Sequence, residues 1–160
     1  MLTANKLRKL LHYYPMIGIM VWRVSKGTAR AGNTAGTIHH TGYRDISVAH
    51  KKYKAHRLAW LYIHGTWPEG EIDHINGILD DNRLDNLRVV TRSQNMQNQR
   101  RARIDNKVGM LGVRIIRGKF VAYVGVGNKK YKYIGSYPGA SEAHNAYIVA
   151  KRELHSSCTI

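Results

Sequence analysis

Five polar residues between positions 73 and 95 include the chemical groups that hydrolysis of a phosphodiester requires. A neutral histidine can take a proton from water near neutral pH, because its unperturbed pKa is about 6.5. A hard cation such as Mg²⁺ can stabilise the phosphoryl charge and the leaving oxygen, and it prefers oxygen ligands. The segment offers Asp73, His74, Asn82, Asn86 and Asn95 in that order. Each has an ordinary interpretation when taken singly, as a surface histidine or an asparagine of a turn or cap. Together, inside a basic chain, they predict a site for metal-assisted hydrolysis.

The elements around these residues predict how they are positioned. Residues 71–75 and 87–90 favour two short strands, and the Asn76-Gly77 dipeptide between them is typical of a turn. Thr91 followed three residues later by Gln94 indicates a capping box that begins a polar helix over 92–103. The middle of the chain is therefore predicted to be strand, loop, strand and helix.

The rest of the chain predicts a mixed fold of class α+β. Leu7, Leu10 and Leu11 have helical spacing after Thr3, which is a candidate cap. Helices are predicted over 3–12, over 55–64 and from Ser141 onward. Short strands are predicted over 19–24, 37–40, 43–48, 112–116, 120–126 and 131–134, with Gly127-Asn128 marking a hairpin.

The charge of the chain indicates an acidic partner. Its 160 residues hold 26 Lys and Arg against 10 Asp and Glu, for a formal net charge of +16. Nucleic acid is the commonest partner of such a surface. An anionic membrane surface is the rival, but no long basic amphipathic helix is visible. Six of the ten acids lie together between residues 69 and 85, which indicates either a cation site or a solvated loop: Glu69, Glu71, Asp73, Asp80, Asp81 and Asp85.

Cys158 is the only cysteine, which excludes an internal disulfide and a zinc site of several cysteines. This usage suits a reducing cytoplasm, or the host cytoplasm for a phage-encoded protein. The apolar run from Leu10 to Trp22 is too short to span a bilayer, and no small-residue cleavage site follows it. We therefore expect a cytoplasmic protein without an export signal or a membrane partner.

The text around the five polar residues resembles the HNH endonucleases, in the homing (intron-encoded) and free-standing phage form. Asn86 follows His74 by twelve residues and Asn95 follows it by twenty-one. His56, within the first matching stretch, is expected to be structural. The matching stretches are Ala55-His-Arg-Leu-Ala-Trp, Asp73-His-Ile-Asn-Gly, Asn82-Arg-Leu-Asp-Asn-Leu-Arg-Val-Val-Thr and Ser93-Gln-Asn.

This resemblance implies a ββα-metal unit and a role for each residue. His74 would be the general base, and Asp73 and Asn95 would hold one divalent metal ion, Mg²⁺ or alternatively Mn²⁺. Asn86 would orient the His74 ring, and Asn82 would brace the loop between the strands. Asn95 replaces the last histidine of the family's name, and its amide oxygen still suits a hard cation.

Residues 112–154 resemble an AP2-type DNA-binding domain, which implies a three-stranded sheet in the major groove with a helix behind it. The matching stretches are Gly112-Val-Arg, Gly118-Lys-Phe-Val-Ala, Ile134-Gly-Ser-Tyr and Ser141-Glu-Ala. Gly125 stands where that family often has Arg, and the first hairpin is shorter and lacks a Trp. The implied DNA contacts are Arg114, Arg117, Tyr123 and Tyr133, with Lys130 and Lys132 beside them on phosphates.

We therefore predict two parts: a nuclease module over 1–105, with its catalytic core at about 70–103, and an AP2-like DNA-binding domain over 106–160. The expected reaction is site-preferring hydrolysis of double-stranded DNA that leaves 5′-phosphate and 3′-hydroxyl ends. One monomer, without an obligate protein partner, is predicted to nick one strand. Six arginines near the site and along the linker are expected to grip phosphates: Arg57, Arg88, Arg92, Arg100, Arg101 and Arg103.

Two alternatives come from other classes of protein. One is a DNA-binding regulator whose nuclease region is inactive, against which the intact Asp73, His74, Asn86 and Asn95 argue. The other is a protein that binds or cleaves RNA. Competition between duplex DNA and structured RNA would separate it from a DNA nuclease.

Overall fold

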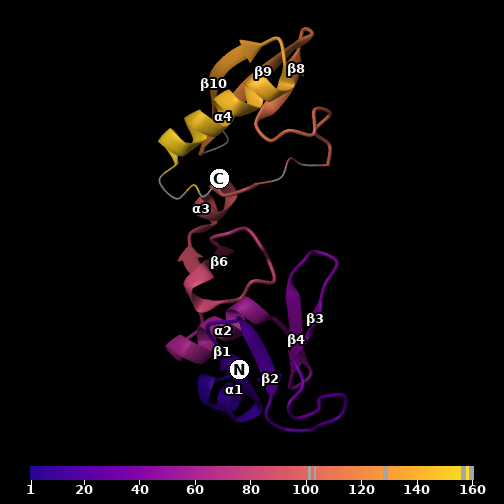
Figure 1. Ribbon diagram of the computed structural model, residues 1–160. Helices are drawn as coiled ribbons and strands as arrows, with labels where there is room; N and C mark the ends of the chain where they lie inside the picture. The colour runs from indigo at the N-terminus through magenta and orange to yellow at the C-terminus, as the bar shows by residue number, and fades with distance from the viewer. Residues whose placement is uncertain (101, 103, 128–129, 156–157, 159–160) are drawn as a thin grey trace. The chain divides into compact units, whose positions relative to one another are not determined.

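The computed structural model describes residues 1–100, 102, 104–127, 130–155 and 158. The chain is a mixed α/β protein that divides into two compact units, Met1–Thr91 and Arg92–Ile160, and each is described by itself below (Figure 1). The predicted functional boundary near residue 105 stays a prediction. Within the described residues, no helix combines the length and the apolarity that crossing a membrane requires.

The first unit consists of short strands around two helices. The strands pair as β1-β2, β3-β4-β5 and β6-β7, and all of these pairs are antiparallel. The elements are α1 (Ala4–Leu10), β1 (Leu11–Tyr14), β2 (Ile19–Trp22), β3 (Thr37–Ile38), β4 (Arg44–Val48), β5 (Lys51–Lys54), α2 (Ala55–His64), β6 (Glu71–His74), the 3₁₀ turn η1 (Leu84–Asn86) and β7 (Leu87–Val90).

One hydrophobic cluster holds this unit together. Leu58 and Leu61 of α2 are fully or almost fully buried, and they belong to the same cluster as Ile46 of β4. Ile72 of β6 and Leu87 of β7 join that cluster. The β6-β7 hairpin is thereby anchored to the core of the unit, which fixes the residues at its open end.

The second unit is a three-stranded antiparallel sheet with a helix on one face. Its sheet has the order β10-β9-β8, and α4 packs on it through Ala143 and Tyr147, against Val113, Ala122 and Val124 (Figure 1). The elements are α3 (Arg92–Gln97), β8 (Val113–Ile116), β9 (Lys119–Gly127), β10 (Lys130–Tyr137) and α4 (Ala140–Leu154).

Most of the elements predicted from the sequence are present. Helix α2 and strand β7 have the predicted bounds, and the Thr3 hydroxyl caps α1 by accepting from the Lys6 amide at 3.3 Å. The predicted helix over 3–12 is too long, since β1 begins at Leu11. Strand β1 alternates buried and less buried side chains from Leu11 to Tyr14, and this two-residue period lies inside the apolar run that follows α1.

The predicted polar helix over 92–103 is wrong in its length, because α3 ends at Gln97. No residue of α3 is buried, so this helix lacks the apolar face through which tertiary packing extends most helices. Strand β5 was not predicted at all, because its Lys51-Lys52-Tyr53-Lys54 text lacks an apolar alternation. Asn128, predicted in the hairpin between β9 and β10, lies outside the described residues.

Candidate active site

The β6-β7 hairpin presents two polar side chains to opposite faces. In the register of the pair, Asp73 lies opposite Arg88 and His74 lies opposite Leu87. Because strand side chains alternate, His74 shares the inner face with the core residue Ile72, whereas Asp73 points to the other face. His74 is only 3% exposed to solvent, so its ring is surrounded by neighbouring side chains.

Asn82, in the loop between the two strands, is the amide that meets the His74 ring. His74 Nε2 lies 3.3 Å from Asn82 Oδ1, and the Asn82 Nδ2 group donates to the Asp80 carbonyl at 3.0 Å. This second bond turns the amide oxygen toward the ring, so that Nε2–H is the donor. Nδ1 then carries the lone pair, which is the form that a general base needs.

Two further rings pack against His74. The His56 ring of α2 lies 5.1 Å from it, edge to face, and the Tyr43 ring lies 6.0 Å from His74 and 5.2 Å from His56. Burial lowers the pKa of His74, although the hydrogen bond that its ring donates to Asn82 and the nearby Asp73 act in the opposite direction. Burial lowers the pKa of His56 to about 3, and the neighbouring His74 adds to this effect. Both imidazoles are therefore neutral at pH 7.

Asn86 makes its side-chain hydrogen bonds within the loop, and its predicted role in orienting the His74 ring stays a prediction. Its Oδ1 accepts from the Asn76 amide at 2.9 Å, and its Nδ2 donates to the Asp81 carbonyl at 2.7 Å. The amide that is hydrogen-bonded to the His74 ring is that of Asn82, which the turn before η1 places beside the ring.

The N-terminal hairpin supports Asn82 from behind. The buried Tyr13 hydroxyl of β1 donates to the Asn82 carbonyl at 2.7 Å, and the Leu84 amide donates to the Pro15 carbonyl at 3.1 Å. Gly18, at φ +73°, lies so close that a Cβ atom there would be 2.5–2.6 Å from backbone atoms of Arg83 and Asn82. Residues far apart in sequence therefore fix the position of the amide that holds His74.

Two carboxylates of the acidic segment are paired with arginines. Arg44 binds Asp80 through two nitrogens at 2.8 and 2.9 Å, and Arg83 binds Asp81 in the same way, which lowers the pKa of Asp81 to about 2. These two carboxylates brace the loop. Among the described residues, no group of three or more His, Cys, Asp or Glu side chains is arranged to hold a metal ion.

Asp73 is the carboxylate that adjoins His74 in the chain. Its Oδ2 accepts from Arg88 Nη2 at 2.8 Å and from Arg88 Nε at 3.0 Å. Arg88, which was predicted to bind phosphate, therefore pairs with Asp73, which was predicted to bind the metal. A carboxylate oxygen such as that of Asp73 and an amide oxygen such as that of Asn95 are each of the kind that Mg²⁺ accepts while it keeps several waters. The assignment of these two residues as metal ligands stays a prediction.

The remaining residues predicted near the site are distributed over both units. Arg57 donates to the Gly70 carbonyl at 3.4 Å and lies over the Trp67 ring, so it supports the turn before β6. Asn95 lies on α3 and belongs to the second unit. Arg92 and Arg100 are exposed in that unit, and Arg101 and Arg103 lie outside the described residues.

Three of the residues predicted from the AP2 resemblance, Arg114, Tyr123 and Tyr133, are placed on one face by the sheet register. Arg114 lies opposite Val121, and Tyr123 lies opposite Tyr133, which puts all of these on the face away from α4. Arg117 occupies the hairpin between β8 and β9 at φ +50°. Lys130 and Lys132 are exposed on β10, which is an edge strand of the sheet.

A buried neutral imidazole that is hydrogen-bonded to an amide, next to a carboxylate in a basic chain, has the chemistry to take a proton from water. Residues 53–97 match the family model of the HNH endonucleases, and Asp73, His74, Asn82, Asn86 and Asn95 all lie within the match. This match supports an HNH nuclease acting on nucleic acid. No curated protein and no solved structure matches the chain.

Three residues of this site were not predicted from the sequence. Tyr13 lies in β1 and Tyr43 lies just before β4, and the distance of both from His74 in the chain conceals their contact with the site. Gly18 could have been found from its place in a Pro-Met-Ile-Gly turn between apolar segments, although nothing there indicates that the turn docks on Asn82.

Proposed function

We propose that this protein is a metal-dependent DNA endonuclease of the HNH type, in which His74 activates the attacking water. The observation that supports this most directly is the Nε2 contact with Asn82, because it leaves the Nδ1 lone pair as the proton acceptor. As the proton moves from water to Nδ1, the positive charge on the imidazolium is stabilised by the Asn82 amide oxygen and by the nearby carboxylates of Asp73, Asp80 and Asp81.

The second part of the proposal is one divalent cation held by Asp73 and Asn95, with Mg²⁺ first and Mn²⁺ as the alternative. The bound cation would supply charge stabilisation for the phosphoryl oxygens and the leaving oxygen. Arg88 pairs with the Asp73 carboxylate from the neighbouring strand until a cation binds. The neutrality of His74 keeps its ring available as a base near pH 7.

The second unit supports a DNA substrate and a preference among sites. Residues 92–160 hold thirteen Lys and Arg against three acids, Asp105, Glu142 and Glu153, so this unit is strongly basic. We propose that it acts as an AP2-like DNA-binding domain, with Arg114, Tyr123 and Tyr133 toward the bases. Arg92, Arg100 and Lys132 are exposed and suit contacts to phosphates.

Because the chain carries a single Asp-His-Asn-Asn set, we further propose a homing-type nickase that acts as a monomer in the cytoplasm. One set can address one strand in a given pose, and concerted cutting of both strands would require a symmetric pair. The products would carry 5′-phosphate and 3′-hydroxyl ends.

Cleavage of supercoiled plasmid tests this function. With Mg²⁺, open circles should accumulate before linear DNA at a rate first order in protein, and EDTA should abolish the reaction. Labelling of the ends should identify the 5′-phosphate. Binding without cleavage at any divalent metal would favour the inactive regulator instead. Cleavage of structured RNA in preference to plasmid would favour the RNA enzyme.

A further inference from the structure

The face of the second unit that α4 does not cover is built from aromatic rings around one arginine. Tyr131 lies opposite Gly125, and Tyr133 lies opposite Tyr123 in the register of β9 and β10. Tyr131 is 59% exposed and Tyr133 is 56% exposed, which is unusual for such large rings in a small sheet. These rings therefore form a surface that the protein's own core does not use.

The rings are held in fixed positions by contacts among themselves. The Arg114 guanidinium lies 5.1 Å from the centre of the Tyr131 ring and 5.9 Å from that of the Tyr123 ring, so it lies near both. The Tyr123 and Tyr133 rings meet edge to face at 5.6 Å. A cation placed among aromatic faces and backed by a sheet presents flat, preorganised surfaces to a ligand.

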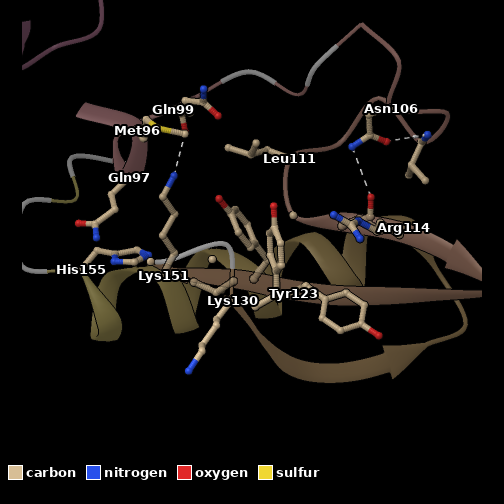
Figure 2. Close-up of a pocket in the computed structure, with 18 of the residues that line it drawn as sticks. Met96, Gln97, Gln99, Asn106, Leu111, Arg114, Tyr123, Lys130, Lys151 and His155 are labelled. Atoms are coloured by element: carbon tan, nitrogen blue, oxygen red, sulfur yellow. Dashed lines mark hydrogen bonds between the residues drawn. The ribbon is translucent and has the colours of Figure 1, made fainter. Parts of the chain in front are cut away.

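This face continues into a groove of about 1090 Å³, which Arg114, Tyr123 and Tyr131 help to line. Strand β9 continues to Gly127 beyond its last pairing with β8, at Ala122. Residues of this last part of β9 help to line the groove: Tyr123, Val124, Gly125 and Gly127. Figure 2 shows Lys151 in the groove, where its ammonium group donates to the Gln99 carbonyl at 2.8 Å. The volume lies just above the range of ordinary ligand sites, about 300–1,000 Å³, and suits a stretch of polymer more than a metabolite.

Gly125 leaves the Tyr131 ring uncovered on its strand side. A Cβ atom at this position would lie 3.7–3.9 Å from the ring, which is ordinary contact without a clash. A side chain would therefore fit here, and it would cover part of the ring. The glycine keeps that surface open.

We propose that this face binds unpaired DNA bases, which stack on Tyr131 and Tyr133 beside Arg114, while Lys130 meets the backbone. Every base has a flat π face that an exposed aromatic ring can bind, and a basic groove attracts the phosphates whatever the sequence. Bases inside an intact duplex are already stacked on one another and cannot use the rings in this way. The ligand would be a single strand, a gap or a frayed end. The inference relies on the proposed function only for the choice of DNA as the polymer.

The test is binding by the full chain in EDTA, so that no cleavage is needed. Fluorescence anisotropy would compare a single strand, the same strand in a blunt duplex, the same duplex with an internal gap, and the equivalent single-stranded RNA. We expect the single strand and the gapped duplex to bind more tightly than the blunt duplex. The single-stranded RNA should bind no more tightly than the single-stranded DNA. A 2-aminopurine in the single strand should lose fluorescence on binding, because stacking quenches it.

Four variants make the test specific. Tyr131→Leu should weaken single-strand binding by about 5- to 100-fold and abolish the quenching, since it removes one stacking partner. Tyr131→Phe should retain both, and Gly125→Val should weaken binding by covering the ring. The control is Tyr14→Leu, a 45% exposed tyrosine of the first unit, which should change nothing.

Three results would overturn the inference: tighter binding of the blunt duplex, tighter binding of RNA, or equal losses for Tyr131→Leu and the control. If plasmid is nicked but single strands are not bound, the inference fails and the nuclease function stands. If single strands are bound through Tyr131 but no cleavage occurs under any metal, the nuclease function fails instead.

Discussion

Replacing Asn82 with Ala should impair both the stability and the chemistry of the site, by amounts that the contacts allow us to estimate. The substitution removes the acceptor 3.3 Å from His74 Nε2 and the donor 3.0 Å from the Asp80 carbonyl, in a region where Asn82 is 1% exposed. A buried donor left without its acceptor costs about 1–3 kcal/mol of unfolding free energy. Loss of the group that orients a catalytic ligand or base costs about 10- to 100-fold in activity.

The matched control is Asn86→Ala, which removes an amide of the same loop that does not contact His74. Its two hydrogen bonds, at 2.9 and 2.7 Å, predict a similar loss of stability with a smaller loss of single-turnover rate. Urea unfolding and plasmid cleavage under single-turnover conditions give the two quantities. Nitrogen NMR of the His74 ring gives the tautomer, which should be Nε2–H in the wild type and in Asn86→Ala, and mixed in Asn82→Ala. If Asn86→Ala costs more rate than Asn82→Ala at equal stability, or if the tautomer changes in Asn86→Ala alone, the assignment of Asn82 to His74 is refuted.

Three further predictions concern the groups around the site. The pKa of His56 is lowered to about 3, so between pH 6.5 and 3 the unfolded chain binds a proton at this residue that the folded chain does not. The unfolding free energy should therefore fall as the pH drops from about 6.5 toward 3. In urea unfolding, His56→Phe should reduce this fall by up to about 1.4 kcal/mol per pH unit, whereas His40→Gln, at an exposed histidine, should not change it. Arg88→Ala should lower the Mg²⁺ concentration for half-maximal cleavage and tighten Mn²⁺ binding in calorimetry, because the Arg88 guanidinium no longer competes for the Asp73 carboxylate. If the Mg²⁺ concentration for half-maximal cleavage is unchanged or higher, Asp73 is not a metal ligand. Tyr13→Phe should destabilise the protein by about 1–3 kcal/mol through the orphaned Asn82 carbonyl, and an effect as small as that of Tyr14→Phe would show that this hydrogen bond contributes little.

The local parts of the site could be predicted from the sequence because they depend on short-range patterns. The strand text Glu71-Ile-Asp-His places Asp73 and His74 at the end of β6, and the bounds of β7 followed from its apolar run. The capping hydroxyl of Thr3 and the helix over Ala55–His64 are equally local features. The stretch matched by the HNH endonuclease family contains the same residues that the spacing had selected.

The partners of His74 could not be predicted because they depend on how distant segments pack. Asn82 and Asn86 are both amides in one loop, and only the folded path of the loop decides which of them reaches the ring. Tyr43, His56 and Tyr13 reach the site from three other elements, through burial that no spacing in the chain records. The pairing of Asp73 with Arg88 follows from the strand register, which becomes fixed only when the hairpin docks on the core.

The central claim is that His74 takes the proton from the attacking water, and His74→Ala tests it most directly. The measurement is single-turnover cleavage of plasmid with Mg²⁺, together with the affinity for the same DNA in EDTA and the unfolding free energy of the variant. The account predicts that the folded variant loses at least about 10²-fold in rate while its DNA affinity stays near that of the wild type. A variant that folds and cleaves at the wild-type rate would contradict it, and so would a loss of rate that a loss of binding fully explains.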